Sequence, residues 1–154
     1  MRVRALLPDD QSLHLDSVEH DEACVLIRVR SIANSCECPS CASPSGRIHS
    51  RYERKLTDFP WQVLRVRLVW STRRFFCDAD ECPQKIFAER QLTVAAPYSR
   101  RTERLSLAMR CIALACGGEV GARLAERLGM RVSADSLLRQ VRKITISHGG
   151  SGRL

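Results

Sequence analysis

Eight cysteines occur in this chain of 154 residues, and four of them have the spacing of metal ligands. Cys38 and Cys41 are separated by two residues, so their thiolates can grip one tetrahedral ion from the same side of a tight turn. Cys77 and Cys82 form a second, looser pair with four residues between them. Four sulfur ligands leave no coordination position open for a substrate, and thiolates in a tetrahedral arrangement favour zinc. The two pairs therefore predict a structural zinc site.

Two other side chains compete for this site. Cys36 lies two residues before Cys38, a spacing that fits a shared tetrahedral ion less well. His49 lies on the basic side of a predicted strand, where we expect it to be exposed. We expect neither to be a ligand. The sequence leaves open whether one of them replaces a predicted ligand. The remaining cysteines have apolar neighbours and no partner at ligand spacing, which predicts small buried hydrophobic residues: Cys24, Cys111 and Cys116.

The charge composition favours an anionic partner. The chain has 25 Lys and Arg against 17 Asp and Glu, a net charge of +8, and arginine supplies nearly all of the positive charge. Arginine matches phosphate oxygens and the guanine edge, which favours nucleic acid; a charge that only keeps the protein soluble is the alternative. No apolar run approaches the roughly 18 residues of a membrane span, and the first residues lack the apolar stretch of a signal peptide. We expect no membrane partner and a cytoplasmic location, where thiols stay reduced.

Positive charge gathers in two stretches of the chain. Residues 98–154 contain 11 basic and 4 acidic residues, whereas residues 1–97 contain 14 and 13. Within the latter, residues 42–76 hold eight basic residues against only two acidic ones. Each stretch therefore predicts its own contact with an anionic partner.

Alternating apolar residues predict a β-rich first part. Residues 12–31 have the pattern of a hairpin around an acidic turn, and residues 47–56 and 63–76 follow as two further strands. Basic side chains share one side of each of these later strands. We expect four of them to contact DNA phosphates: Arg47, Arg51, Arg65 and Arg67.

From about Ser99 the apolar period changes from 2 to 3.6, which predicts three helices. The first runs to about Cys116 and ends at two glycines, and the second covers about residues 119–128. After a tight turn, Ser133 is the expected N-cap of a third helix, residues 134–144. Apolar residues at helical spacing predict the buried faces of the last two helices: Val120, Leu124 and Leu128, then Leu137, Leu138, Val141 and Ile144.

A short helix, a glycine-containing turn and a helix with a basic free face have the layout of a helix-turn-helix. Arg139 and Gln140 have the chemistry to read guanine or adenine edges. The other polar and basic side chains of this part suit phosphates: Arg100, Arg101, Ser136, Arg142 and Lys143. The alternative is a generic three-helix bundle with a solvated basic face.

The expected fold class is α+β, with a small β-rich zinc-ribbon-like module followed by a three-helix helix-turn-helix module. The expected division of the chain is an N-terminal hairpin (1–34), a zinc-binding β module (35–97), a helix-turn-helix (98–146) and a Gly- and Ser-containing disordered tail (147–154).

In this order, the cysteine pairs, the basic strands and the helices resemble the N-terminal part of bacterial insertion-sequence transposases of the ISL-three group. The resemblance rests on four stretches of residues 36–143: CPSCASPSGRIHSRYERKLTDFPW, VRLVWSTRRFFCDADECPQKIFAERQ, APYSRRTERL and GGEVGARLAERLGMRVSADSLLRQVRK. It implies a zinc-binding segment and a helix-turn-helix that bind double-stranded DNA at the terminal inverted repeats of a mobile element, in a nucleoid-associated cytoplasmic protein.

The resemblance also implies a following catalytic domain with three acidic residues that hold two metal ions. After Lys143 the chain reads ITISHGGSGRL, which departs from the family pattern. We therefore expect a truncated product, through a frameshift or premature stop, and no catalytic activity by this chain alone. The alternatives are a zinc-dependent regulatory or interaction module that self-associates, pairs with a full-length transposase or regulates transcription, and an enzyme fragment that keeps activity.

Overall fold

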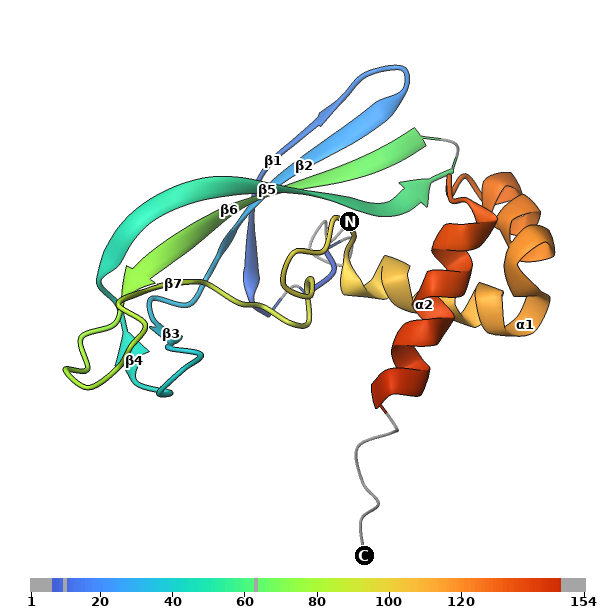
Figure 1. The fold of residues 1–154 in the computed structure, drawn as a ribbon. Coiled ribbons are helices and arrows are strands. Elements are labelled where there is room, and N and C mark those ends of the chain that lie inside the picture. The colour runs from blue at the N-terminus through green and yellow to red at the C-terminus, as the bar shows by residue number, and fades with distance from the viewer. Residues whose placement is uncertain (1–6, 10, 63, 148–154) are drawn as a thin grey trace, which may run out of the picture.

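The computed structural model describes residues 7–9, 11–62 and 64–147, without the side chains of 143–147, and shows a mixed α+β fold (Figure 1). The β-rich N-terminal region that the sequence predicts is confirmed. Its strands are β1 (Leu13–His20), β2 (Cys24–Ser31), β3 (Cys36–Glu37), β4 (Pro44–Ser45), β5 (Ile48–Trp61), β6 (Leu64–Phe76) and β7 (Ile86–Ala88). Two helices follow, α1 (Glu103–Arg127) and α2 (Ala134–Ser147).

Five of the strands form one sheet: four follow the order β1-β2-β6-β5, and β7 pairs with β6. The predicted hairpin is confirmed, because β1 pairs antiparallel with β2. β2 then pairs in parallel with β6, from Cys24 opposite Arg65 to Arg30 opposite Ser71. The long antiparallel pair β5–β6 forms an arm with the short strands β3, β4 and β7 at one end and the helices at the other (Figure 1).

One face of the sheet carries the main core, while the other face is largely basic. Alternate residues of β2 and β6 are buried beneath Leu7 and the loop residues Val94 and Ala95. Trp70 on β6 is fully buried, and its indole Nε1 donates to Ser31 Oγ at 3.1 Å. Burying these side chains fixes the register, since a slip of one residue would turn them all to the opposite face.

A buried carboxylate joins the sheet to the first helix. Asp58 on β5 is 2% exposed and accepts hydrogen bonds from Thr102 Oγ1 at 2.7 Å and Arg104 Nε at 2.8 Å. Thr102 is also the N-cap of α1, and its hydroxyl accepts from the backbone N–H of Leu105. Two backbone hydrogen bonds between Thr57 and residues 100 and 102 complete the junction. The start of α1 is therefore held on β5 by the ion pair of Asp58 with Arg104, by the Thr102 hydroxyl and by two backbone hydrogen bonds.

The prediction of three helices is wrong, because the described chain has two. The expected helix end at Cys116 is instead a kink inside α1, where Gly117 has φ 73° and ψ −167°. Glycine adopts this backbone conformation readily, whereas other residues rarely do. The α1 ribbon turns along its length, and α2 packs across it (Figure 1). The expected N-cap of α2 is confirmed, since Ser133 Oγ accepts from the backbone N–H of Ser136.

The buried face expected after the kink is also wrong. Val120, Leu124 and Leu128 are 53%, 40% and 52% exposed, and the small residues Gly121 and Ala125 face the helical core instead. A Cβ atom on Gly121 would lie 3.2 Å from side-chain atoms of Ile112 and Leu137, so this glycine allows close packing of the helices.

Other expectations for apolar residues of the helical part are met only in part. Leu137 is fully buried, but Leu138 is 39% exposed; the side chain of Ile144 lies outside the described residues. Cys111 is exposed rather than buried, and Cys24 and Cys116 are half-buried.

By length and mean hydropathy, α1 is the one described helix that would pass as a membrane span. It contains the kink at Gly117, and Arg110 in its first third pairs with Glu103. α1 is therefore not a clear membrane span.

Replacing Gly129 with alanine is expected to lower the free energy of unfolding by about 1–2 kcal/mol, the cost of a left-handed backbone at a residue with a Cβ atom. Gly129 ends α1 with φ 80°, and an added Cβ would lie 3.2 Å from Pro60 and from the carbonyl oxygen of Gln62. Urea denaturation measures the effect. Gly46→Ala is the matched control, since the nearest atom to its Cβ is 3.5 Å away. Equal stability of the two variants would contradict this account of Gly129.

Candidate metal centre

The first cysteine pair lies in a tight turn closed by a two-stranded hairpin. β3 and β4 pair around it, and Cys38 N–H donates to the carbonyl oxygen of Ser43 at 2.9 Å. The backbone N–H of Ala42 returns to the carbonyl oxygen of Cys38 at 2.8 Å, with Ala42 in the left-handed region at φ 59°. This turn points both sulfur atoms to the same side.

The second pair lies where β6 ends. Cys77 directly follows the last residue of β6, and its backbone N–H donates to the carbonyl oxygen of Lys85 at 2.8 Å. The chain turns at Ala79, whose carbonyl oxygen accepts from Cys82 N–H at 3.1 Å, before β7 begins. Phe75 and Phe87 stack beside the cysteines, with ring centroids 5.8 Å apart. A small aromatic core thus supports this turn.

The two turns bring the four predicted sulfur atoms together. All four lie within 4.8 Å of one another, with Cys38 Sγ 3.8 Å from Cys82 Sγ and Cys41 Sγ 3.5 Å from Cys77 Sγ. Zinc–sulfur bonds of about 2.3 Å in a tetrahedron place the sulfur atoms about 3.8 Å apart, so the cluster fits a zinc ion. Three of the four cysteines are buried and Cys41 is exposed. Four sulfur ligands complete a tetrahedral zinc coordination, which is the arrangement of a structural site.

The protonation of the thiols indicates why a cation suits the cluster. The hydroxyl and the backbone N–H of Ser43 donate to Cys41 and lower the pKa of its thiol to about 6. The backbone N–H of Ala79 favours the Cys77 thiolate, but burial and the neighbouring sulfur atoms outweigh it and raise the pKa of Cys77 to about 12. The cluster therefore does not hold several thiolates easily without a positive charge among them.

The two competing side chains lie outside the cluster. Cys36 is half-buried in β3 and packs against the small core beside the site. His49 is exposed on β5, with Nδ1 2.9 Å from Ser50 Oγ and its ring 4.9 Å from that of Phe76.

A comparison with protein families decides the kind of segment that this is. Residues 34–82 match the family model for the zinc-finger of transposase IS204/IS1001/IS1096/IS1165. The match covers 49 of the 154 residues and contains all four clustered cysteines. No curated protein and no solved structure matches the chain. The transposase zinc-finger match and the sulfur cluster together support structural zinc binding, as the sequence predicts.

The arginines predicted to contact DNA lie in more than one place. Arg65, Arg67 and Arg101 line a crevice of about 210 Å³ where the sheet meets the helices, which we call the junction crevice. Arg131, which the sequence reasoning did not single out, lines it too. These side chains come from β6, from the loop before α1 and from the loop before α2, so only the tertiary fold shows that they converge.

A second crevice adjoins the first. Arg100 and Gln140 line it, and it shares Arg101 and Thr57 with the junction crevice. It therefore brings Gln140 of α2 close to the basic residues that precede α1.

The remaining predicted residues are more scattered. Arg47 directly precedes β5, at the end of the β5–β6 arm that carries the four cysteines, which we call the zinc end. It pairs with Asp78 and covers the Phe76 ring. Arg51 lies opposite Arg73 on the basic face of the sheet. On α2, Arg139 pairs with Asp135 at 2.5 Å. Arg142 is exposed and Ser136 is half-buried, while the side chain of Lys143 lies outside the described residues.

Proposed function

We propose that this chain is a DNA-binding module related to the front part of insertion-sequence transposases and that it binds double-stranded DNA at the terminal inverted repeats of such an element in the cytoplasm. The observation that carries the proposal is the convergence of Arg65, Arg67, Arg101 and Arg131 on one crevice, which is partly lined by the transposase-type zinc-finger segment itself. In this proposal the chain binds DNA and does not cut it.

The zinc ion has a purely structural role in the proposal. Cys38, Cys41, Cys77 and Cys82 would hold it, and it would supply the cross-link between the β3–β4 turn and the end of β6. This cross-link fixes the zinc end of the β5–β6 arm, including Arg47. The division of the chain into a hairpin, a zinc module, a helical module and a tail belongs to the proposal; residues 148–154 of that tail lie outside the described residues.

The charge of the junction crevice supports phosphate binding. Within the described part of the chain, Arg65, Arg67 and Arg101 have no carboxylate at ion-pair distance, so their charge is available to an anionic ligand. Guanidinium groups bind phosphate oxygens in a bidentate manner. We assign these three arginines, with Arg100, to the DNA backbone.

Helix α2 is the element that we propose to enter a groove. It would act as the second helix of a helix-turn-helix-like pair whose first helix is the part of α1 after the kink. Arg139 and Gln140 would read base edges, and Ser136, Arg142 and Lys143 would contact the backbone. The exposed pair of Arg139 with Asp135 is worth at most about 1 kcal/mol, so DNA can displace it.

Salt dependence tests the electrostatic part of this proposal. If about six phosphates are neutralised, the logarithm of affinity falls with the logarithm of salt concentration at a slope of roughly −5. Arg67→Ala is expected to reduce the slope by about 1, because it removes one phosphate contact. Fluorescence anisotropy with a labelled duplex measures both.

Arg123→Ala is the matched control, because Arg123 is exposed on α1 and lines neither crevice. It should leave the slope near that of the natural protein. A flat salt dependence of the natural protein, or equal effects of the two variants, would contradict the assignment.

Exposed apolar residues of α1 favour one second candidate function. Leu114, Val120, Leu124 and Leu128 are each at least 40% exposed, which suits a module that pairs with itself or with a full-length transposase. Light scattering after size exclusion tests self-pairing. A stable complex with partner protein and no DNA affinity would favour this candidate over DNA binding.

A further inference from the structure

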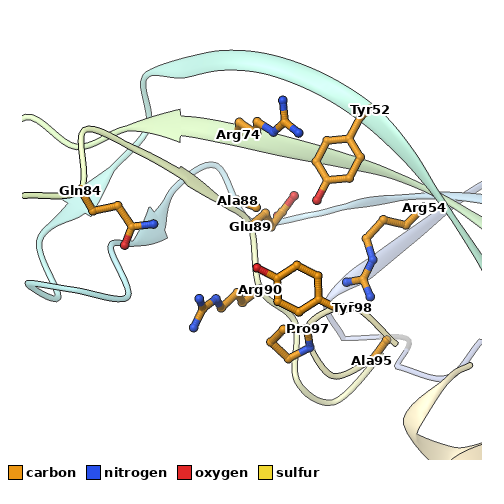
Figure 2. A pocket seen from close by; sticks show the side chains of 10 residues that line it. All are labelled: Tyr52, Arg54, Arg74, Gln84, Ala88, Glu89, Arg90, Ala95, Pro97 and Tyr98. Atoms are coloured by element: carbon orange, nitrogen blue, oxygen red, sulfur yellow. The ribbon is translucent and has the colours of Figure 1, made fainter. Parts of the chain in front are cut away.

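A cavity of about 380 Å³ lies between the sheet and the loop that precedes α1, within the size range of small-ligand sites. Figure 2 shows Tyr52, Arg54 and Arg74 reaching it from the strands, and Arg90 and Tyr98 from the loop opposite. We call it the tyrosine pocket. It contains none of the cysteines of the metal centre and none of the residues assigned above to DNA.

The loop side of the tyrosine pocket is held in place by Arg54. Its guanidinium donates to the carbonyl oxygens of Ala96 and Ser99, at 3.0 and 3.1 Å, and these two residues flank the tip of the loop. Arg54 itself covers the buried Trp70 ring at 5.3 Å. The loop is thus tied to the core of the sheet and forms a fixed wall.

Tyr98 at the tip of this loop has two unusual properties. Its backbone is in the left-handed region, at φ 60°, and its side chain is 100% exposed. A bulky side chain rarely adopts this backbone conformation, and strained residues of this kind cluster at binding sites. Exposing a whole aromatic ring to water also brings no packing gain. The fold therefore presents the Tyr98 ring to solvent at an energetic cost.

The tyrosine pocket is positively charged. Arg74 and Arg90 have no carboxylate at ion-pair distance within the described residues. Glu89 also lines the pocket, but Arg73 neutralises its buried carboxylate with a pair at 2.5 Å. Arg74 covers the Tyr52 ring at 4.8 Å, which holds its guanidinium at the pocket wall. An anionic ligand with a flat apolar part fits these groups.

We propose that the tyrosine pocket binds one unpaired nucleotide of a DNA strand, with the base stacked on Tyr98 and the phosphate at Arg74 and Arg90. Exposed aromatic rings beside arginines are the usual platform for unpaired bases. Tyr98 also lines the crevice that contains Arg100 and Gln140, so a strand leaving the proposed duplex site passes directly to the pocket. This inference rests on the proposed DNA binding and adds a preference for a frayed or single-stranded end.

Two labelled DNA probes test the inference in fluorescence anisotropy with the full chain: a blunt mixed-sequence duplex and the same duplex with a short unpaired thymidine tail. The natural protein is expected to bind the tailed duplex about tenfold more tightly, the usual effect of stacking one base on an aromatic ring. Tyr98→Ala should reduce the ratio of the two affinities to near one. Tyr98→Phe keeps the ring and should keep the ratio, as should the charge control Arg123→Ala.

The outcomes separate this inference from the proposed function. Binding to neither duplex contradicts both. Equal affinity of the natural protein for the blunt and tailed duplexes contradicts the inference alone, as does a ratio that Tyr98→Ala leaves unchanged. Circular dichroism of each variant checks that the fold is intact. A loss of the preference for the tailed duplex can then be attributed to the Tyr98 ring.

Discussion

Replacing Cys77 with serine is expected to abolish zinc binding and to unfold the zinc end of the β5–β6 arm. Cys77 is buried and contributes one of four clustered sulfur atoms, so its loss leaves three ligands and opens the site to water. Structural zinc contributes about 10–16 kcal/mol to the folding of isolated zinc-finger peptides. The free energy of unfolding of the Cys77→Ser variant should therefore fall by more than about 3 kcal/mol.

The small size of the local core explains this large effect. Among the described residues, the buried members of the cluster around the site are three of the cysteines themselves and two aromatic residues, Phe75 and Phe87. Two aromatic side chains bury too little surface to hold the two cysteine-containing turns. The first turn is closed only by the two-residue strands β3 and β4, and the second is followed only by the three-residue strand β7. Hydrogen exchange should show lost protection in residues 36–45 and 77–88, with protection of β1 and β2 retained.

Cys111→Ser is the matched control for this prediction. Cys111 is exposed on α1 and has no neighbour in the sulfur cluster, so the variant should keep its zinc and its stability. A Cys77→Ser protein with the zinc content and hydrogen exchange of the Cys111→Ser protein would contradict the assignment.

Replacing Asp58 with alanine is the second change with a large expected effect. We expect it to lower the free energy of unfolding by about 3–5 kcal/mol. The Asp58 side chain is fully buried and accepts hydrogen bonds from Thr102, Arg104 and the backbone N–H of Phe59. Without the Asp58 carboxylate, these buried donors lose their shared acceptor, and the ion pair between Asp58 and Arg104 is lost. At about 2–4 °C per kcal/mol for a chain of this size, the midpoint of thermal unfolding should fall by roughly 6–20 °C.

Asp78→Ala controls for the loss of an aspartate. Asp78 pairs with Arg47, but the two side chains are 55% and 60% exposed, so water screens this pair and its loss should change stability little. Differential scanning calorimetry of both variants checks the prediction. Equal midpoints would show that Asp58 does not hold α1 on the sheet.

The metal centre was the most predictable feature, because its signal is local. Two cysteines separated by two residues define a turn, and the second pair follows a strand that the alternation of apolar residues predicts. The β1–β2 hairpin and the N-cap at Ser133 were predictable for the same reason. Within each cysteine pair, in the hairpin and at the cap, the residues that decide the local structure lie within a few positions of one another. The meeting of the two cysteine pairs, such as Cys38 with Cys82, is a contact between distant residues.

Features that depend on distant residues were not predictable in this way. The parallel pairing of β2 with β6 and the salt bridge between Asp58 and Arg104 join residues about 40 to 46 positions apart. The exposure of Val120 follows from close helix packing at Gly121, because small residues allow the helices to meet there. Helical periodicity is judged from large apolar side chains and gives less weight to glycine and alanine. It therefore predicted burial of the face with Val120, whereas the face with Gly121 and Ala125 is the buried one.

We infer that one zinc ion, held by four sulfur atoms, folds the end of the β5–β6 arm. Native mass spectrometry of the purified chain tests it most directly, before and after treatment with a strong chelator. We expect one zinc ion per chain before treatment. After treatment we expect a zinc-free chain with a broader charge distribution, which is the sign of partial unfolding. A native chain without metal, whose charge distribution the chelator leaves unchanged, would contradict it.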